Sequence, residues 1–498
     1  MKNVALHNLG CKVNSYEMDF VQQKLQEKGY KIVAFDKKAD VYIVNTCSVT
    51  NIADRKSRQM LHRAKKLNPE AVVVAMGCYV QAGKEEALKD DCIDLAIGNN
   101  RKKDLVEILE AFLSERQSSD ESKAHTPGSS LGERRSADEG KVEAGGKAHT
   151  SGSSLGERRS AHDGKAAQLP GNAEVERKTL GCTTIIDIGA ADEYEEMMLT
   201  DTAEHTRAYI KIQDGCNQFC TYCIIPYARG RVRSRRMEEI VKEISGLRDK
   251  GYREIVLTGI HISSYGLDWD KKPHLLELIR RIHEISGIER IRIGSLEPRI
   301  VTEEFARELS GLHKVCPHFH LSLQSGCDKT LKAMNRRYDT EEFLEKVLLL
   351  RRYFDAPAIT TDVIVGFPGE TEEDFAITEE FLRKVQFFEM HIFPYSRREG
   401  TRAASMPGQL TEAEKKMRSH KLFALEREQS DAFRRQFLGK QVEVLFEEEK
   451  ELDGQHYYVG YTREYMKAAI RTDENLSNVL KSVEACELRG ELLLVRSR

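Results

Sequence analysis

The sequence predicts an α/β protein with three folded domains: an N-terminal parallel-sheet α/β domain, a central partial barrel of six strand–helix units, and a small C-terminal β-barrel. Three observations lead to this prediction. Strand and helix patterns alternate up to residue 115, they alternate again over 203–400, and short alternating strands replace them after Gly439. At 498 residues the chain is also too long for one core. The expected boundaries are 1–115, 116–200 for a linker, 201–437 and 438–498.

Composition excludes several classes of protein. The 77 basic and 80 acidic residues nearly cancel, so only local charge clusters can point to a partner. Eleven cysteines, an odd number spread over the whole chain, do not form a disulfide framework. The first residues lack the basic region and apolar run of a signal peptide. No stretch approaches the roughly 20 apolar residues that span a bilayer. We expect a soluble, cytoplasmic monomer without a membrane segment.

In the N-terminal part, three cysteines follow three predicted strands. Cys11, Cys47 and Cys78 each lie just past the carboxyl end of a strand pattern. Ligands bind at that edge of open parallel sheets, so we expect the three thiols to meet and to form one metal site. Three unrelated buried thiols are the alternative. The predicted strands are 4–9, 41–46, 72–77 and 94–98, and the predicted helices are 14–28, 52–67, 81–89 and 101–113.

A duplicated polar segment separates the first two domains. Residues 123–141 recur as 147–165 with 16 of 19 positions identical. The segment is rich in Gly, Ser and charge and offers almost no apolar side chains to bury, so it cannot offset the entropy cost of ordering. We therefore expect a disordered linker.

The alternating strand and helix patterns of the central part predict a barrel. We expect its active site at the carboxyl ends of the strands, as in other βα barrels. A charged helix over 411–436 should follow it. The predicted strands are 207–213, 254–260, 290–295, 318–324, 359–367 and 389–395, and the predicted helices are 237–250, 274–286, 302–312, 328–334, 340–354 and 371–384.

The loop after the first barrel strand carries Cys216, Cys220 and Cys223, four and then three residues apart. Three thiolates in one tight loop suit an iron–sulfur cluster, which uses four ligands when the protein supplies them all. With three ligands, one iron would stay open for a substrate. A zinc site or three structural cysteines are the alternatives. However, zinc needs a fourth ligand, and no histidine or cysteine occurs between Cys223 and His261.

Beyond Gly439 the pattern predicts a small barrel of the OB-like type. Acidic residues outnumber basic ones there by 12 to 9 over 438–498, so RNA binding by this barrel would depend on shape and on its tyrosines. Those tyrosines are Tyr457, Tyr458, Tyr461 and Tyr465. The predicted strands are 441–447, 456–462, 466–471, 483–489 and 491–496.

Five arginines follow the cysteine loop directly. They are Arg229, Arg231, Arg233, Arg235 and Arg236. Such a charge run is often only a solvated face, but arginine binds phosphate with its planar fork. Because the cluster is local in a nearly neutral chain, we expect these side chains to bind RNA.

Six motifs together resemble one family, the radical S-adenosylmethionine (SAM) methylthiotransferases. They are LGCKVNSYE (9–17), NTCSVT (45–50), GCY (77–79), GCNQFCTYCIIPYARGRVRSR (215–235), HLSLQSG (320–326) and TDVIVGFPGET (361–371). The chain most resembles the branch that methylthiolates C2 of N6-threonylcarbamoyladenosine at position 37 of tRNA. The alternatives are the isopentenyladenosine-37 branch, with a GCQMN-like first motif where this chain has GCKVN, and the branch that modifies a ribosomal protein. The C-terminal barrel is similar to the TRAM domain of this family.

The resemblance implies two [4Fe–4S] clusters and SAM as cofactors. Catalytic Cys216, Cys220 and Cys223 would hold the cluster that reduces SAM, and the resulting radical would remove hydrogen from C2 of the adenine. A second cluster on Cys11, Cys47 and Cys78 would hold the sulfur to be inserted. The implied partners are a tRNA anticodon loop, an electron donor such as flavodoxin or ferredoxin, and a sulfur donor.

SAM contacts are expected where later barrel strands end. Gly259 and His261 end the second strand, and Ser295 and Glu297 end the third. Gly366 should let the backbone approach the adenine of SAM, and Pro368 should stiffen that turn. Each of these residues also suits a tight turn without any ligand.

Overall fold

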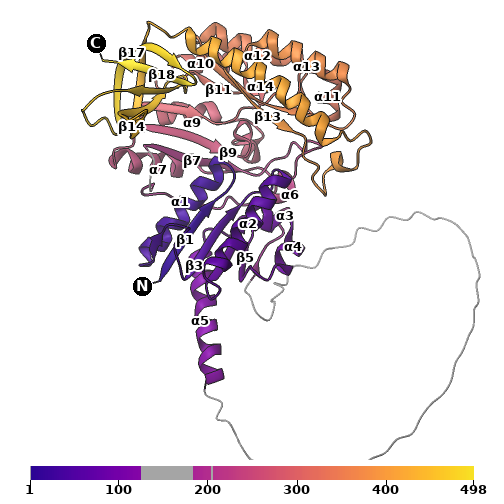
Figure 1. Ribbon diagram of the computed structural model, residues 1–498, viewed down its shortest axis with the longest axis vertical. Coiled ribbons are helices and arrows are strands. Elements are labelled where there is room, and N and C mark those ends of the chain that lie inside the picture. The colour runs from indigo at the N-terminus through magenta and orange to yellow at the C-terminus, as the bar shows by residue number, and fades with distance from the viewer. Residues whose placement is uncertain (1, 125–182, 203–205, 498) are drawn as a thin grey trace, which may run out of the picture.

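The computed structural model describes residues 2–124, 183–202 and 206–497. Figure 1 shows the N-terminal sheet below the central barrel, with the C-terminal β-barrel packed against the side of the latter. The duplicated segment lies outside the described residues, apart from its first two positions. No helix in the described part is long and apolar enough to cross a membrane.

The N-terminal sheet is parallel throughout, in the order β2-β1-β3-β4-β5-β6. Its central strands β3 and β4 are buried along their whole length, as valine- and isoleucine-rich strands covered on both faces should be. Helices α1 and α5 cover one face, and α2, α3 and α4 cover the other. The strands are β1 (Asn3–Asn8), β2 (Lys31–Val33), β3 (Val41–Thr46), β4 (Val72–Gly77), β5 (Leu95–Ile97) and β6 (Thr183–Thr184); the helices are α1 (Lys12–Glu27), α2 (Asn51–Leu67), α3 (Cys78–Ala82), α4 (Lys84–Lys89) and α5 (Leu105–Ala124).

The central barrel is open and is built from two parallel groups of strands. Strands β7, β9 and β10 form one group, with the short β8 antiparallel to β7, and β11, β12 and β13 form the other. Single bridges join the groups at Ile291–Val315 and Leu296–Leu321. The strands are β7 (Arg207–Asp214), β8 (Arg233–Ser234), β9 (Glu254–Gly259), β10 (Arg290–Ile293), β11 (His318–His320), β12 (Ala358–Val365) and β13 (Glu389–Pro394).

Helices cover the outside of the barrel, and their apolar faces share one core with alternate residues of the strands, such as Ile210, Ile212 and Leu257. Successive side chains of a strand point to opposite faces. Tyr209, Lys211 and Gln213 therefore face the barrel interior. The helices are α6 (Ile225–Arg229), α7 (Met237–Asp249), α8 (Leu267–Asp270), α9 (Leu275–His283), α10 (Glu303–Ser310), α11 (Asp328–Ala333), α12 (Thr340–Tyr353) and α13 (Glu372–Val385).

Helix α14 (Glu412–Arg435) begins with a capping box at Thr411 and Glu414 and leads into the C-terminal barrel. That barrel closes in the order β14-β15-β16-β18-β17. It packs against the amino ends of the central strands, where Arg290 and Arg292 donate to its backbone carbonyls. Its strands are β14 (Gln441–Leu452), β15 (Gln455–Thr462), β16 (Lys467–Ile470), β17 (Val479–Arg489) and β18 (Leu492–Arg496).

The expectation of a linker over 116–200 was wrong at both ends. Helix α5 continues to Ala124, and residues 183–202 pack on the folded protein. β6 extends the N-terminal sheet, and Met197 and Leu199 lie in a small core with Tyr16 and Phe20. Their apolar side chains find partners on α1, which the sequence of the segment alone does not show.

Candidate active site with two cysteine triads

The carboxyl edge of the N-terminal sheet brings Cys11, Cys47 and Cys78 together. Cys11 caps α1 in an extended conformation, Cys47 follows β3, and Cys78 opens α3 directly after β4. The turn before α1 is packed so tightly that a Cβ at Gly10 would lie 3.3 Å from Cys47 Sγ. The side-chain amide of Asn14 fixes this edge by donating to the carbonyls of Leu9 and Thr46.

The loop after β7 brings Cys216, Cys220 and Cys223 together. The Cys216 N–H donates to the Gly230 carbonyl over 3.0 Å, which closes the loop at the end of α6. The Cys223 N–H donates to the Cys220 carbonyl over 3.0 Å. Gly215 has φ +73°, and a Cβ there would lie 1.8 Å from the Arg231 carbonyl oxygen, so only glycine fits.

Each triad has its own arginine that donates a hydrogen bond to one of its sulfurs. Arg229 Nε lies 3.3 Å from Cys78 Sγ, and Arg336 Nη1 lies 3.3 Å from Cys220 Sγ. Hydrogen bonds to sulfur are among the contacts with which proteins tune iron–sulfur clusters. Our sequence analysis missed Arg336, since nothing in Asn335-Arg336-Arg337 after α11 distinguishes it from a surface arginine.

Five buried charged side chains form a network that contacts Cys78 of the first triad and includes Asp214, two residues before Cys216 of the second. Glu17 of α1 contacts Lys102, Lys211 and Arg229, and Asp214 contacts Lys211 and Arg229. Burial alone would raise the pKa of Glu17, but Arg229 and the two lysines outweigh it and hold that pKa well below its usual range. Two carboxylates against three cations leave a surplus positive charge beside Cys78, which suits a thiolate.

The chemistry of both triads fits a bound metal centre. In the absence of metal, burial raises the pKa of Cys47 and Cys216 to about 11 and that of Cys223 to about 12. These buried thiols would release their protons on binding iron, as thiol ligands must. The two arginine contacts then remain as donors to the thiolate sulfurs.

Around the second triad, His261, Glu297 and Arg336 form a polar group at the strand ends. Burial, followed by the nearby charge of Arg336, lowers the pKa of His261 to about 4, so the ring is neutral at pH 7. His261 Nδ1 lies 2.6 Å from Ser264 Oγ, whereas its buried Nε2 has no hydrogen-bond partner in the described residues. An orphaned buried nitrogen beside the cysteine loop fits a site for SAM.

The other expected SAM contacts have different surroundings. Gly259 ends β9, where a Cβ would lie 2.8 Å from Ile262 Cγ2, and Ser295 is exposed after β10. Gly366 and Pro368 are buried in a turn. A Cβ at Gly366 would lie 2.5 Å from Lys415 Cγ of α14, so Lys415 is the close neighbour here and the tight-turn interpretation of Gly366 accounts for its geometry.

The prediction of a run of RNA-binding arginines was wrong for three of the five. Arg229, Arg233 and Arg235 are at most 1% exposed. Arg229 lies in the charge network, Arg235 pairs with Glu243 of α7, and Arg233 donates to the Arg231 and Arg229 carbonyls. Buried guanidinium groups cannot reach phosphates. Only two members of the run, Arg231 and Arg236, are exposed.

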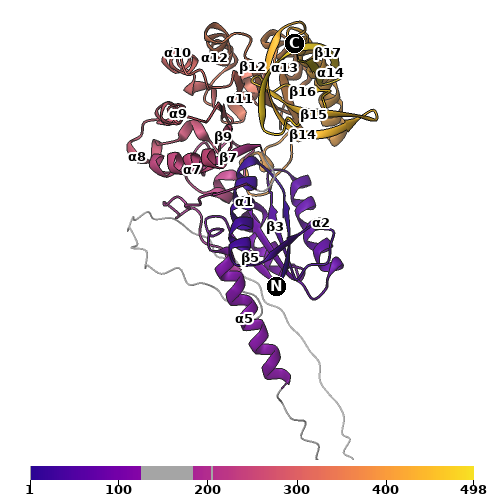
Figure 2. The same ribbon diagram turned by 90° about the vertical axis from the view of Figure 1, so that its left-hand side faces the viewer.

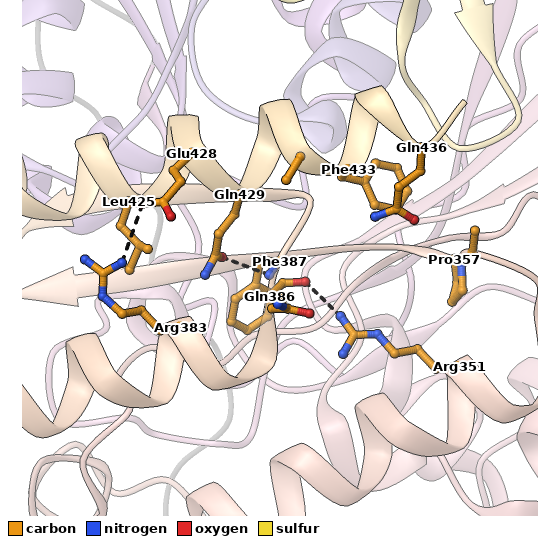
Figure 3. A pocket seen from close by; sticks show the side chains of 12 residues that line it. Arg351, Pro357, Arg383, Gln386, Phe387, Leu425, Glu428, Gln429, Phe433 and Gln436 are labelled. Carbon is orange, nitrogen blue, oxygen red and sulfur yellow. Dashed lines mark hydrogen bonds and ion pairs between the residues drawn. The ribbon is translucent and has the colours of Figure 1, made fainter. Parts of the chain in front are cut away.

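A cavity on the outside of the barrel lies away from both triads. It has a volume of about 450 Å³ and lies between α12, α13 and α14 on the outside of the barrel. Figure 3 shows its arginines already engaged: Arg351 donates to the Gln386 carbonyl, and Arg383 pairs with Glu428. It contains none of the cysteines and is not the candidate site.

The fold and the site define a radical SAM protein. Residues 210–382 match the radical SAM superfamily, and residues 3–98 match the uncharacterized protein family UPF0004. Three relatives extend the match to between 91% and 99% of the chain. The threonylcarbamoyladenosine tRNA methylthiotransferase MtaB of Bacillus subtilis is 36% identical over 97% of this chain and 93% of its own length, and that of Aquifex aeolicus is 37% identical over 91% and 95%. The tRNA-2-methylthio-N(6)-dimethylallyladenosine synthase of Moorella thermoacetica is 34% identical over 99% and 98%. The chain belongs to the tRNA methylthiotransferase family.

A solved structure shares the fold. The radical SAM methyltransferase TsrM from Kitasatospora setae, solved with tryptophan and a SAM analogue, matches with a TM-score of 0.50. The match covers 79% of this chain and 73% of that one at 14% identity. This likeness concerns the arrangement of strands and helices and not the reaction.

Proposed function

We propose that this protein adds a methylthio group to C2 of N6-threonylcarbamoyladenosine at position 37 of tRNA. The observation that carries the proposal is the pair of cysteine triads with an arginine donating to a sulfur of each, and one buried charge network that contacts the first triad and includes Asp214 just before the second. A methylthiotransferase has to activate a carbon and deliver a sulfur at the same place. Two metal centres, one on each triad, would meet that need. The relatives from Bacillus subtilis and Aquifex aeolicus carry this activity in their names.

In this proposal, Cys216, Cys220 and Cys223 hold a [4Fe–4S] cluster and leave one iron open for SAM. Together the cluster and SAM supply the one-electron chemistry that opens an unactivated C–H bond. Arg336 donates to Cys220, and His261 and Glu297 supply polar atoms on the same side of the barrel. These side chains bind and orient SAM.

Cys11, Cys47 and Cys78 hold a second [4Fe–4S] cluster that carries the sulfur. Its support is the meeting of three strand ends and the donation from Arg229 to Cys78. We assign the electron to an external donor such as flavodoxin or ferredoxin, and the sulfur to an external sulfur donor. The N-terminal sheet, the barrel to residue 437 and the C-terminal barrel from 438 act as three domains, and the first two carry the cysteines of the site.

Helix α2 supplies the surface for the tRNA backbone. It begins four residues after Cys47 and carries six basic residues against one acidic residue. The exposed members Arg55, Lys56, Arg58, Arg63 and Lys66 have no ion pair with any residue that the structure describes. Unpaired surface cations next to the site are what phosphate contacts need. Figure 2 shows α2 on the outer side of the N-terminal sheet, where a large partner can reach it.

Aromatic side chains at the entrance of the site could stack on an unpaired base of the RNA. Tyr227 on α6 is 49% exposed, and its ring lies 5.8 Å from that of Phe219 in the cysteine loop. The Arg231 guanidinium lies 4.8 Å from the Phe219 ring centroid. Aromatic rings and arginine planes stack on unpaired bases of single-stranded RNA loops, so we assign this group to the anticodon loop.

Nucleoside mass spectrometry of tRNA from a deletion strain tests the proposal. The strain should lack the methylthio derivative and retain threonylcarbamoyladenosine. Wild-type protein should restore the derivative, and a variant with Cys216, Cys220 and Cys223 all replaced by Ala should not. Loss of methylthio-dimethylallyladenosine instead would assign the chain to the activity of its Moorella thermoacetica relative.

A further inference from the structure

Lys12 lies where the three domains meet. It is the first residue of α1 and follows Cys11 directly. Its Nζ lies 6.0 Å from the ring centroid of Tyr209 on β7 and 5.9 Å from that of Tyr465, which follows β15 in the C-terminal barrel. Tyr465 is held in place by stacking on Tyr461 at 4.9 Å between centroids. The ammonium group therefore faces a space bounded by all three domains.

Lys12 has no carboxylate within ion-pair distance among the described residues, and the acids around it are already engaged. Glu254 lies nearby but pairs with Arg292 over 2.9 Å and with Arg290 over 3.5 Å. Glu447 pairs with Arg207 over 2.7 Å. The lysine is thus a partly buried cation that lies over two aromatic rings but has no carboxylate partner, which leaves it free to bind an anionic group.

Histidines of the barrel interior lie near the Lys12 ammonium group, and one of them has a buried nitrogen without a hydrogen-bond partner in the described residues. His318 lies 5.0 Å from Tyr465 between ring centroids, and its buried Nδ1 has no hydrogen-bond partner in the described residues. His320 Nε2 is buried and lies 3.2 Å from Asp362 Oδ2, so it already has a partner. His391 stacks on His320 and is exposed. The unsatisfied buried nitrogen of His318, near a cation that has no carboxylate partner, indicates a site for a polar, anionic group.

We infer that Lys12 binds the carboxylate of the threonyl group of the substrate nucleoside, which makes it the residue that selects for this modification. The inference rests on the proposed function. A threonylcarbamoyl group carries one carboxylate, together with N–H and O–H donors. Asp362 is the carboxylate that can accept from those donors, at the side of the space formed by β12. A dimethylallyl group has neither charge nor donors and would leave Lys12 and His318 unpaired. Leaving buried polar groups unpaired is how a site rejects the wrong substrate strongly.

The position of Lys12 links recognition to chemistry. Because Lys12 is adjacent to Cys11, a carboxylate bound by its ammonium group holds the substituent of the base beside the first triad.

Equilibrium binding of two anticodon stem-loops, identical except for the threonylcarbamoyl group, tests the inference. The wild type should bind the modified stem-loop at least about tenfold more tightly, the effect of one charge-assisted hydrogen bond. Lys12→Gln should lose most of this preference and bind the unmodified stem-loop as the wild type does. Lys12→Arg, which keeps the charge, should retain part of the preference. Lys24→Gln, on the same helix but paired with Glu27, is the matched control and should behave as wild type.

An unchanged preference in Lys12→Gln would overturn the inference. So would an equal loss of affinity for both stem-loops, since Lys12 would then contact the common backbone. Iron content and SAM cleavage in Lys12→Gln show whether the variant still assembles its metal centres. Conversion of threonylcarbamoylated tRNA by the wild type separates the two claims. If conversion fails, the proposed function fails, whereas conversion with an unaltered preference in Lys12→Gln overturns only the role of Lys12.

Discussion

Arg229 donates from Nε to Cys78 Sγ over 3.3 Å, across 151 residues of chain. The same guanidinium donates to Asn14 and Glu17 of α1, the helix that begins after Cys11, and it pairs with Asp214 just before the second triad. One fully buried side chain therefore contacts the supports of both triads. The relative position of the two proposed metal centres depends on it.

Arg229→Met should destabilise the protein strongly. The substitution leaves Glu17 and Asp214 buried with one cation fewer. Removing one partner of a buried ion pair lowers the free energy of unfolding by about 3–5 kcal/mol. Urea unfolding followed by tryptophan and far-UV signals measures the change. The control is Arg231→Met two residues away, where the side chain is exposed and the change in unfolding free energy should stay within about 0.5 kcal/mol. Equal effects of the two substitutions would show that the network does not stabilise the fold.

The two triads should hold separate clusters. Replacing Cys11, Cys47 and Cys78 by Ala should halve the bound iron and still allow SAM cleavage to 5′-deoxyadenosine. Replacing the other triad should also halve the iron but abolish cleavage. Iron assay and chromatography of SAM products check both variants. Full iron in the first variant, or methylthiolated product from it, contradicts the assignment.

Most regular elements could be predicted from the sequence. Strands β3 and β4 have the expected bounds, because fully buried parallel strands are continuous apolar runs. Our sequence analysis missed the short strands β2, β6 and β8, because a strand of two or three residues is too short to show an alternating apolar and polar pattern. β11 ends at His320, earlier than expected, because only the isolated bridges of Leu321 and Gln324 continue its pairing.

Arg336→Lys should lower the reduction potential of the cluster held by the second triad. The arginine donates to Cys220 Sγ, and a positive donor at a sulfur stabilises the more negative, reduced cluster. Lysine keeps the charge but not the planar fork that also reaches Tyr338. A redox titration followed by electron paramagnetic resonance measures the potential. An unchanged or higher potential with full iron content would rule out this role.

The basic face of α2 should hold tRNA regardless of its modification. Replacing Arg55, Lys56, Arg58 and Arg63 by Ala should weaken binding of modified and unmodified tRNA alike. The dependence of log affinity on log salt should flatten by roughly 0.7–0.9 per lost phosphate contact. As a control, replacing Arg280, Arg281 and Arg307, which already pair with glutamates, should change neither quantity. Unaltered salt dependence in the α2 variant would place the tRNA elsewhere.

The candidate site was only partly predictable. The cysteines could be identified because their spacing and their places at strand ends follow from local sequence. The fate of the arginines could not, because burial of Arg229 depends on Glu17, 212 residues away, and that of Arg235 on a contact with α7. Lys12 escaped notice for the same reason: the tyrosines beside it come from two other domains.

The most direct test of the account is conversion by reconstituted protein of three tRNAs that differ only at position 37. The reaction contains SAM, a reductant and a sulfide source, and nucleosides are identified by mass spectrometry. The account predicts a methylthiolated product from threonylcarbamoylated tRNA and none from unmodified or dimethylallylated tRNA. Equal conversion of the dimethylallylated tRNA, or no product from the threonylcarbamoylated one, would contradict it.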